Sequence, residues 1–119
     1  RLDPTRQLCL ASQVAAGHRV TVYSFGDIPG LPRDIIRADA GAILPHSFAE
    51  RLRPLEPDGS WRNRTMLQYS DFFRMRLMEQ RLGLWVDADV LLLKPIMIDT
   101  AKPYFAWEDP YRLGNSVLY

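Results

Sequence analysis

The chain has 119 residues, of which 47% are hydrophobic and 24% are charged, which is the size and composition of one globular domain with a buried core. Its formal net charge of +1 gives no general attraction to nucleic acid, so we expect no nucleic-acid partner. The single cysteine, Cys9, excludes a disulfide framework, and no apolar run approaches the roughly 20 residues that a membrane span requires.

The first predicted elements are a helix and a strand. Asp3 is a typical N-cap and Pro4 suits the first helical position, so we expect a helix over residues 5–16 that ends at a left-handed Gly17. Small side chains recur on one face of this helix and predict close packing on a sheet. They are Leu8, Ala11, Ser12 and Ala15. Residues 19–24 alternate and are β-branched, which predicts a strand.

The middle of the chain contains short elements and turns. Residues 34–37 predict a short strand. Ser47 and Glu50 match a capping box, which starts a helix that Pro54 ends. Residues 54–60 are rich in proline, glycine and acidic side chains and predict a mobile surface loop.

A second long helix is expected from about Thr65, ending before a tight turn at Gly83. Residues 84–86 are bulky and apolar, which favours a strand buried on both faces of a parallel sheet. Trp85 and Trp107 are predicted to lie in the core. Further short strands are predicted at residues 96–98, 104–107 and 116–119.

Two carboxylates, Asp87 and Asp89, follow the predicted strand at residues 84–86. If the extended geometry continues through Ala88, the two-residue side-chain period directs both carboxylates to the same side. Ligands of open α/β sheets bind beyond the carboxyl ends of the strands, and Mg²⁺ or Mn²⁺ takes one or two carboxylates together with substrate phosphate oxygens. The predicted ligand is a metal diphosphate. The competing interpretation is a plain turn, in which aspartate is common.

Asp71 and Arg74 stand three residues apart on the preceding helix and share a face, as in an ordinary helical ion pair. With Ser70 before them and LGLWVDADVLLLKP after them, their order and spacing resemble nucleotide-sugar glycosyltransferases that contain a DXD-type sugar-binding region. This group includes yeast mannosyltransferases and bacterial capsule or toxin glycosyltransferases. Leu82 departs from the pattern, because the family commonly has the first of two glycines there.

The resemblance implies a partial GT-A fold, which is a Rossmann-like α/β fold with a mixed, mostly parallel sheet flanked by helices. We expect residues 1–119 to form a single domain, the N-terminal donor-binding part of a larger glycosyltransferase, without the first strand and the C-terminal acceptor part. A helix followed by a strand agrees, because it implies an earlier strand upstream of this sequence.

Members of the family are metal-dependent transferases that retain the anomeric configuration of the donor sugar. The resemblance therefore implies transfer of a hexose from a UDP- or GDP-sugar to a glycan or other hydroxyl acceptor, as in polysaccharide biosynthesis, with Mn²⁺ or Mg²⁺ as cofactor. We expect the cytoplasm or the membrane periphery for a bacterial chain and the Golgi lumen for a eukaryotic one.

The resemblance also assigns roles to individual residues. The implied metal ligands are Asp87 and Asp89, which with Arg74 are the implied catalytic groups. The implied nucleotide-sugar contacts are Ser70, Asp71, Arg74, Asp87 and Ala88, and the implied acceptor side is Glu108 with Asn115. A cationic arginine and a metal ion would both stabilise charge on a departing diphosphate.

Two other functions compete with this one. A phosphatase of the haloacid dehalogenase type also has an apolar strand followed by D-x-D, but then requires Thr or Val two residues later, where this chain has Leu91. The other alternative is a truncated or non-catalytic module that binds a sugar nucleotide without transferring the sugar.

Overall fold

The computed structural model describes residues 2–52 and 61–119, and of residues 61–65 it describes the backbone alone. The predicted mobile loop at residues 54–60 lies outside the described residues. In chain order the elements are α1 (Pro4–Ala15), β1 (Thr21–Ser24), β2 (Ile36–Asp39), the 3₁₀ helix η1 (Ala40–Ala42), α2 (His46–Arg51), α3 (Trp61–Glu79), β3 (Trp85–Val86), β4 (Phe105–Asp109) and β5 (Arg112–Leu118).

The strands form two small sheets. Strands β1 and β2 pair in parallel, and β3, β5 and β4 form an antiparallel sheet with β5 in the middle. The chain is therefore a small mixed α/β protein. The predicted mostly parallel sheet is wrong for the described strands, because two of their three pairings are antiparallel. The β4–β5 hairpin explains the difference, since a short turn can join antiparallel strands whereas parallel strands need a long crossover.

Helix α1 confirms the predicted cap but not the predicted packing face. The Asp3 side chain accepts a hydrogen bond from the Arg6 amide, and Gly17 ends the helix with φ 87°. The buried residues are Cys9, Leu10 and Gln13, whereas Leu8 on the predicted face is 62% exposed. Docking through Leu10 buries a large aliphatic side chain, which removes more apolar surface from water than a face of small residues would.

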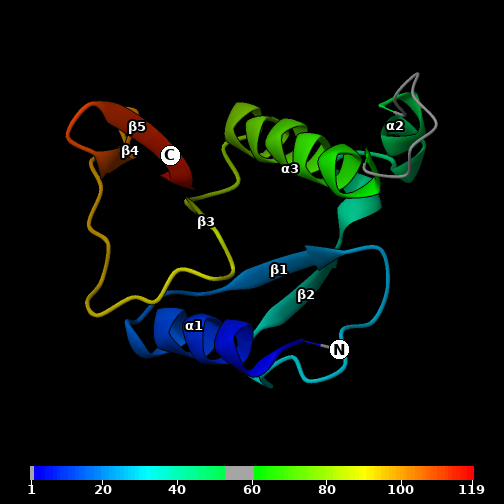
Figure 1. Cartoon of the computed structure of the whole chain (residues 1–119). Coiled ribbons are helices and arrows are strands. Elements are labelled where there is room, and N and C mark those ends of the chain that lie inside the picture. The colour runs from blue at the N-terminus through cyan, green and yellow to red at the C-terminus, as the bar shows by residue number, and fades with distance from the viewer. Residues whose placement is uncertain (1, 53–60) are drawn as a thin grey trace.

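Two helices cover opposite faces of the β1–β2 pair (Figure 1). Val22 and Tyr23 are neighbours on β1, so their side chains point to opposite faces. Val22 packs against the buried cluster that contains Leu10 of α1, and Tyr23 packs with Phe73 of α3. The alternation along a single strand therefore fixes the order of the three layers.

The larger core cluster lies against α3. Its buried residues are Ala40, Leu44, Ala49, Tyr69, Phe73 and Leu77. The three α3 members follow at four-residue spacing and share a face. Phe73 contacts both Tyr23 and Trp85, with ring centroids 5.5 and 6.3 Å apart. This one side chain therefore joins β1 to β3.

The start of α2 differs from its prediction. The helix begins at His46 after Pro45, and no side chain caps it. The predicted capping box of Ser47 and Glu50 is therefore wrong. Pro45 explains the earlier start, because its fixed φ favours the entry to a helix and its carbonyl accepts from the Phe48 amide at 2.9 Å.

The C-terminal part contains the other corrections. Gly83 adopts φ 128°, as a tight turn requires, and β3 then pairs antiparallel with β5. Residues 96–98, predicted as a strand, form none. Trp107, predicted in the core, is 67% exposed because it lies on the outer strand β4, opposite Leu113 of β5.

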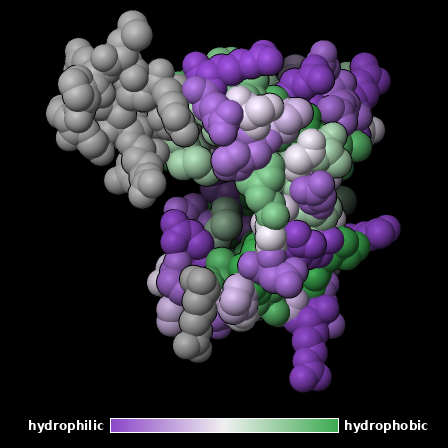
Figure 2. All heavy atoms as spheres, turned by 90° about the vertical axis from the view of Figure 1, so that its right-hand side faces the viewer, coloured by the Kyte–Doolittle hydropathy of each residue, from purple (hydrophilic) through white to green (hydrophobic). Residues whose placement is uncertain are grey.

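Hydrophilic residues predominate on the face that Figure 2 shows, with hydrophobic residues in smaller areas between them. None of the helices in the described ranges combines the length and the apolar composition that crossing a bilayer demands. The Cα radius of gyration is 15.3 Å, above the roughly 13.5 Å typical of a compact domain of this length. The chain is therefore less compact than a typical domain of its length.

Candidate functional site

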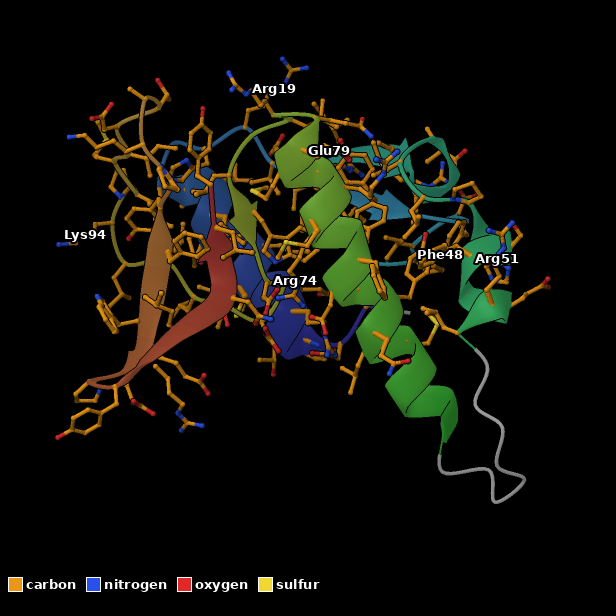
Figure 3. All side chains as sticks on the ribbon, turned by 90° about the horizontal axis from the view of Figure 1, so that it is seen from above. Arg19, Phe48, Arg51, Arg74, Glu79 and Lys94 are labelled. Carbon is orange, nitrogen blue, oxygen red and sulfur yellow. The ribbon has the colours of Figure 1, made fainter. Side chains whose placement is uncertain are left out.

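The Arg74 guanidinium lies where α3 meets β3 and β5, and Figure 3 shows its side chain leaving α3 toward these strands. The residue is 7% exposed. Nη1 donates to the Asn115 main-chain oxygen at 2.7 Å, and Nη2 lies 3.2 Å from Asp71 Oδ1. Nη1 is also 3.6 Å from Asp87 Oδ1, and the guanidinium carbon stands 5.2 Å from the Trp85 ring centroid. Two carboxylates and an aromatic ring thus surround one buried cation.

Further hydrogen bonds connect the same group. Arg74 donates to the main-chain oxygen and to Oγ of Ser70, both at 3.4 Å. The Asn115 side chain donates to Asp71 Oδ1 at 3.4 Å. The structure therefore brings together the residues predicted on α3, Ser70, Asp71 and Arg74, with Asn115 of β5. We call the residues around this guanidinium the Arg74 cluster; they are Ser70, Asp71, Arg74, Trp85, Asp87 and Asn115.

Asp87 is held in the Arg74 cluster by two different bonds. Its amide donates to the Ser116 oxygen at 2.8 Å, which extends the β3–β5 pairing by one residue. Its Oδ1 accepts from Trp85 Nε1 at 2.7 Å. The sequence assigned Trp85 to the core alone and missed this contact, although residues two apart on a strand share a face.

The chain turns at residues 87–90, which we call the carboxylate turn. The Val90 amide donates to the Asp87 oxygen at 3.1 Å, and β3 ends at Val86. The extended geometry therefore does not continue through Ala88, so strand periodicity does not place both carboxylates on one side. A turn gives each side chain its own direction.

Ala88 and Asp89 lie on the α1 side of the carboxylate turn. Ala88 packs against the cluster of Leu10 and neighbouring apolar residues, and Asp89 is exposed. The pKa of the Arg6 guanidinium is raised, first by its hydrogen bond to Asp3, then by the charge of Asp3, and to a smaller extent by the charge of Asp89. Asp89 therefore lies within electrostatic reach of the start of α1.

Gln13 of α1 was not predicted as a site residue. It is 4% exposed, and Nε2 donates to the main-chain oxygens of Asp87 at 3.4 Å and Val90 at 3.3 Å. A glutamine inside a helix carries no pattern that distinguishes this contact from an ordinary exposed position. The sequence therefore held no signal for it.

The two residues predicted on the acceptor side lie on adjacent strands. Asn115 belongs to the Arg74 cluster through its contacts with Asp71 and Arg74. Glu108 is exposed on β4. Asn115 is thus placed beside the residues predicted to contact the donor.

The carboxylates of this region have the chemistry that Mg²⁺ and Mn²⁺ prefer. Asp89 is exposed, and the contacts of Asp87 with Trp85 and Arg74 both use Oδ1. Within residues 2–52 and 66–119, no three His, Cys, Asp or Glu side chains lie close enough to hold a metal by themselves. One or two carboxylates suffice where substrate phosphates complete the coordination, so the number and chemistry of the carboxylates at this turn meet the minimum for such an ion.

Comparison of the chain with protein-family models, curated proteins and solved structures finds no match. The resemblance to glycosyltransferases therefore rests on the motif residues and their spacing. The structure adds the contacts that join Asp71 and Arg74 of α3 to Asp87 beyond β3.

Proposed function

We propose that this chain is the donor-binding part of a metal-dependent, retaining glycosyltransferase that moves a hexose from a UDP- or GDP-sugar to a glycan or other hydroxyl acceptor. The observation that carries the proposal is the buried Arg74 guanidinium, which lies 3.2 Å from Asp71 and 3.6 Å from Asp87. The helix residues and the carboxylate that follows β3 thus contact one another across the fold, as a two-part donor site requires.

The Arg74 cluster suits a reaction that builds negative charge. Breaking the bond between a sugar and a diphosphate develops charge on the departing phosphate oxygens. A guanidinium that Asp71 and Asn115 already hold in place is oriented before that charge develops, which favours its stabilisation. A divalent ion held by Asp87 and Asp89 would supply additional electrostatic stabilisation of the same oxygens.

The GT-A fold and the cellular location are also part of this proposal. The parallel β1–β2 pair with helices on both faces is the expected local arrangement of a GT-A domain. We assign the enzyme to the cytoplasm or the membrane periphery if the chain is bacterial, and to the Golgi lumen if it is eukaryotic.

Asp89→Asn tests the proposal, because Asp89 is exposed and its replacement should leave the fold intact. Calorimetry with UDP, GDP and their hexose conjugates is expected to show Mn²⁺-dependent binding to the wild-type chain, weakened by about tenfold or more in Asp89→Asn. Asp99→Asn removes another exposed carboxylate and is the matched control, with unchanged binding. Full Mn²⁺-dependent binding by Asp89→Asn would show that the metal assignment is wrong.

A non-catalytic module that binds sugar nucleotides is the second candidate. One observation favours it: the nitrogens of Arg74 already donate to Ser70 and Asn115. Arginines whose donors are engaged within the protein in this way also occur in ion-pair networks that are purely structural. Nucleotide binding without hydrolysis or transfer by the full-length protein would support this candidate over the enzyme.

A further inference from the structure

Gln13 is a buried polar side chain whose partners lie far away in the sequence. Its Nε2 contacts the main-chain oxygens of Asp87 and Val90, which are the two ends of the carboxylate turn. The Val90 amide closes the same turn on the Asp87 oxygen. One side-chain amide therefore contacts both ends of the loop that carries Asp89.

Two other groups of the same region hold the chain that leaves the turn. Ser12 Oγ accepts from the Leu92 amide at 2.9 Å and donates to the Cys9 oxygen at 2.6 Å. His18 Nε2 accepts from the Ile96 amide at 3.1 Å. Main-chain groups outside regular structure need such partners when they are shielded from water. The α1 region thus supplies polar contacts along the chain from Asp87 to Ile96.

We propose that Gln13 is a positioning residue for the carboxylate turn. By fixing the main chain at Asp87 and Val90, its amide sets the direction in which Asp89 presents its carboxylate to a divalent cation. This inference rests on the proposed function. Residues that orient metal ligands act through the geometry of the ligand, and their loss lowers metal affinity by roughly 10- to 100-fold.

The burial of Gln13 supports a specific role. A buried amide is unfavourable unless its hydrogen bonds are made, so an apolar side chain would serve a purely packing position equally well. The remaining buried residues of α1, Cys9 and Leu10, are apolar. Gln13, the polar residue among the three, lies against the carboxylate turn, which carries the Asp89 carboxylate that the proposed function requires.

Gln13→Met tests the role, because methionine keeps the length and the helix propensity while removing the amide. Gln7→Met is the matched control, since Gln7 lies on the same helix and donates one hydrogen bond to the Leu2 oxygen at 3.0 Å. Amide hydrogen exchange of residues 88–92 in the absence of metal is expected to accelerate by about tenfold in Gln13→Met. The Mn²⁺ concentration for half-maximal UDP or GDP binding is expected to rise by about tenfold. Gln7→Met should change neither quantity.

The outcomes separate the positioning role from the proposed function. If the wild-type chain binds nucleotide with Mn²⁺ and Gln13→Met matches it in exchange and in Mn²⁺ requirement, the positioning role alone is overturned. A lower melting temperature without a change in Mn²⁺ requirement would make Gln13 structural and also overturn it. If the wild-type chain binds no nucleotide with Mn²⁺, the proposed function is wrong and the inference is wrong with it.

Ser12→Ala provides a milder variant in case Gln13→Met does not fold. It removes the acceptor of the Leu92 amide and leaves the Gln13 contacts in place. Faster exchange at Leu92 with a rise in Mn²⁺ requirement of about threefold would support anchoring of the turn by α1. Faster exchange with an unchanged Mn²⁺ requirement would overturn it.

Discussion

Asp87 and Asp89 are separated by one residue, but they lie in different surroundings. Asp87 is held through its side chain by Arg74 and Trp85 on the α3 side. Asp89 is exposed on the α1 side, where Gln13 holds the main chain of the turn. The comparison shows two ways of fixing a carboxylate. One uses charge and an aromatic donor, and the other uses the backbone and leaves the carboxylate exposed.

The largest expected effect is at Phe73, on which the α3 side of this comparison depends. Phe73→Ala should lower the free energy of unfolding by about 3 to 5 kcal/mol, because it leaves a cavity among Tyr23, Tyr69 and Trp85. Urea denaturation measures the change. Phe72→Ala is the neighbouring control and should cost less, since Phe72 is 49% exposed. Equal losses would contradict the proposed importance of this contact.

Replacement of Arg74 should have the next largest effect. Arg74→Met leaves Asp71 and Asp87 without their cation and should cost about 2 to 4 kcal/mol, below the full value for a buried pair because both carboxylates reach solvent. Arg74→Lys keeps the charge but loses the fork of donors, so we expect an intermediate loss. Denaturation curves of Arg74→Met and Arg74→Lys measure the two losses of stability. Coinciding curves would contradict a network that depends on the forked donors of the guanidinium.

The two aspartates themselves give a direct test of the difference between the two sides. Asp87→Ala removes an acceptor from Trp85 and a partner from Arg74 and should cost about 1 to 3 kcal/mol of stability. Asp89→Ala should change stability by less than about 0.5 kcal/mol, as exposed substitutions usually do. Thermal melts measure both losses of stability. A larger loss for Asp89→Ala than for Asp87→Ala would contradict the stronger anchoring of the Asp87 side chain.

Apart from the exposed Asp89, the smallest expected effect concerns Tyr69, which donates to the Leu44 oxygen. Burial, and secondarily the negative charge of Asp39, raises the pKa of Tyr69 above its ordinary value of 10.0. The folded state therefore holds this proton more tightly than the unfolded state, so the stabilisation is complete below about pH 10 and is lost as pH rises through the raised pKa.

Tyr69→Phe should cost about 0.5 to 1.5 kcal/mol near neutral pH, because the hydrogen bond to Leu44 is lost. The variant should also lack this part of the fall in stability at alkaline pH. Urea midpoints of both proteins between about pH 8 and about pH 11 measure the difference. Parallel pH profiles would contradict a raised pKa.

The helical parts of the fold could be predicted from the sequence because they depend on local signals. Asp3, Pro4 and Gly17 delimit α1 through capping and backbone preference alone. The antiparallel pairing of β3 could not be predicted in this way, because it depends on β5, which begins 26 residues later in the chain than the last residue of β3 (112 minus 86). The exposure of Trp107 follows from the same long-range pairing.

The candidate site likewise has parts that local sequence signals predicted and parts that depend on long-range contacts. Helical spacing predicted that Asp71 and Arg74 would share a face, and they do. The contribution of Asn115 came from a resemblance, and its contact with Asp71 depends on the position of β5. The turn at residues 87–90 overrode the extended geometry of a strand, and Gln13, on a helix far away in the sequence, contacts it.

Holding the carboxylate turn by its main chain also has an evolutionary consequence. Gln13 contacts oxygens that every amino acid carries, so the anchor does not depend on which side chains occupy the turn. Position 89 can therefore exchange its aspartate for another polar residue while the loop keeps its place. Anchoring through the main chain therefore lets the side chain at position 89 change its chemistry without a change of fold.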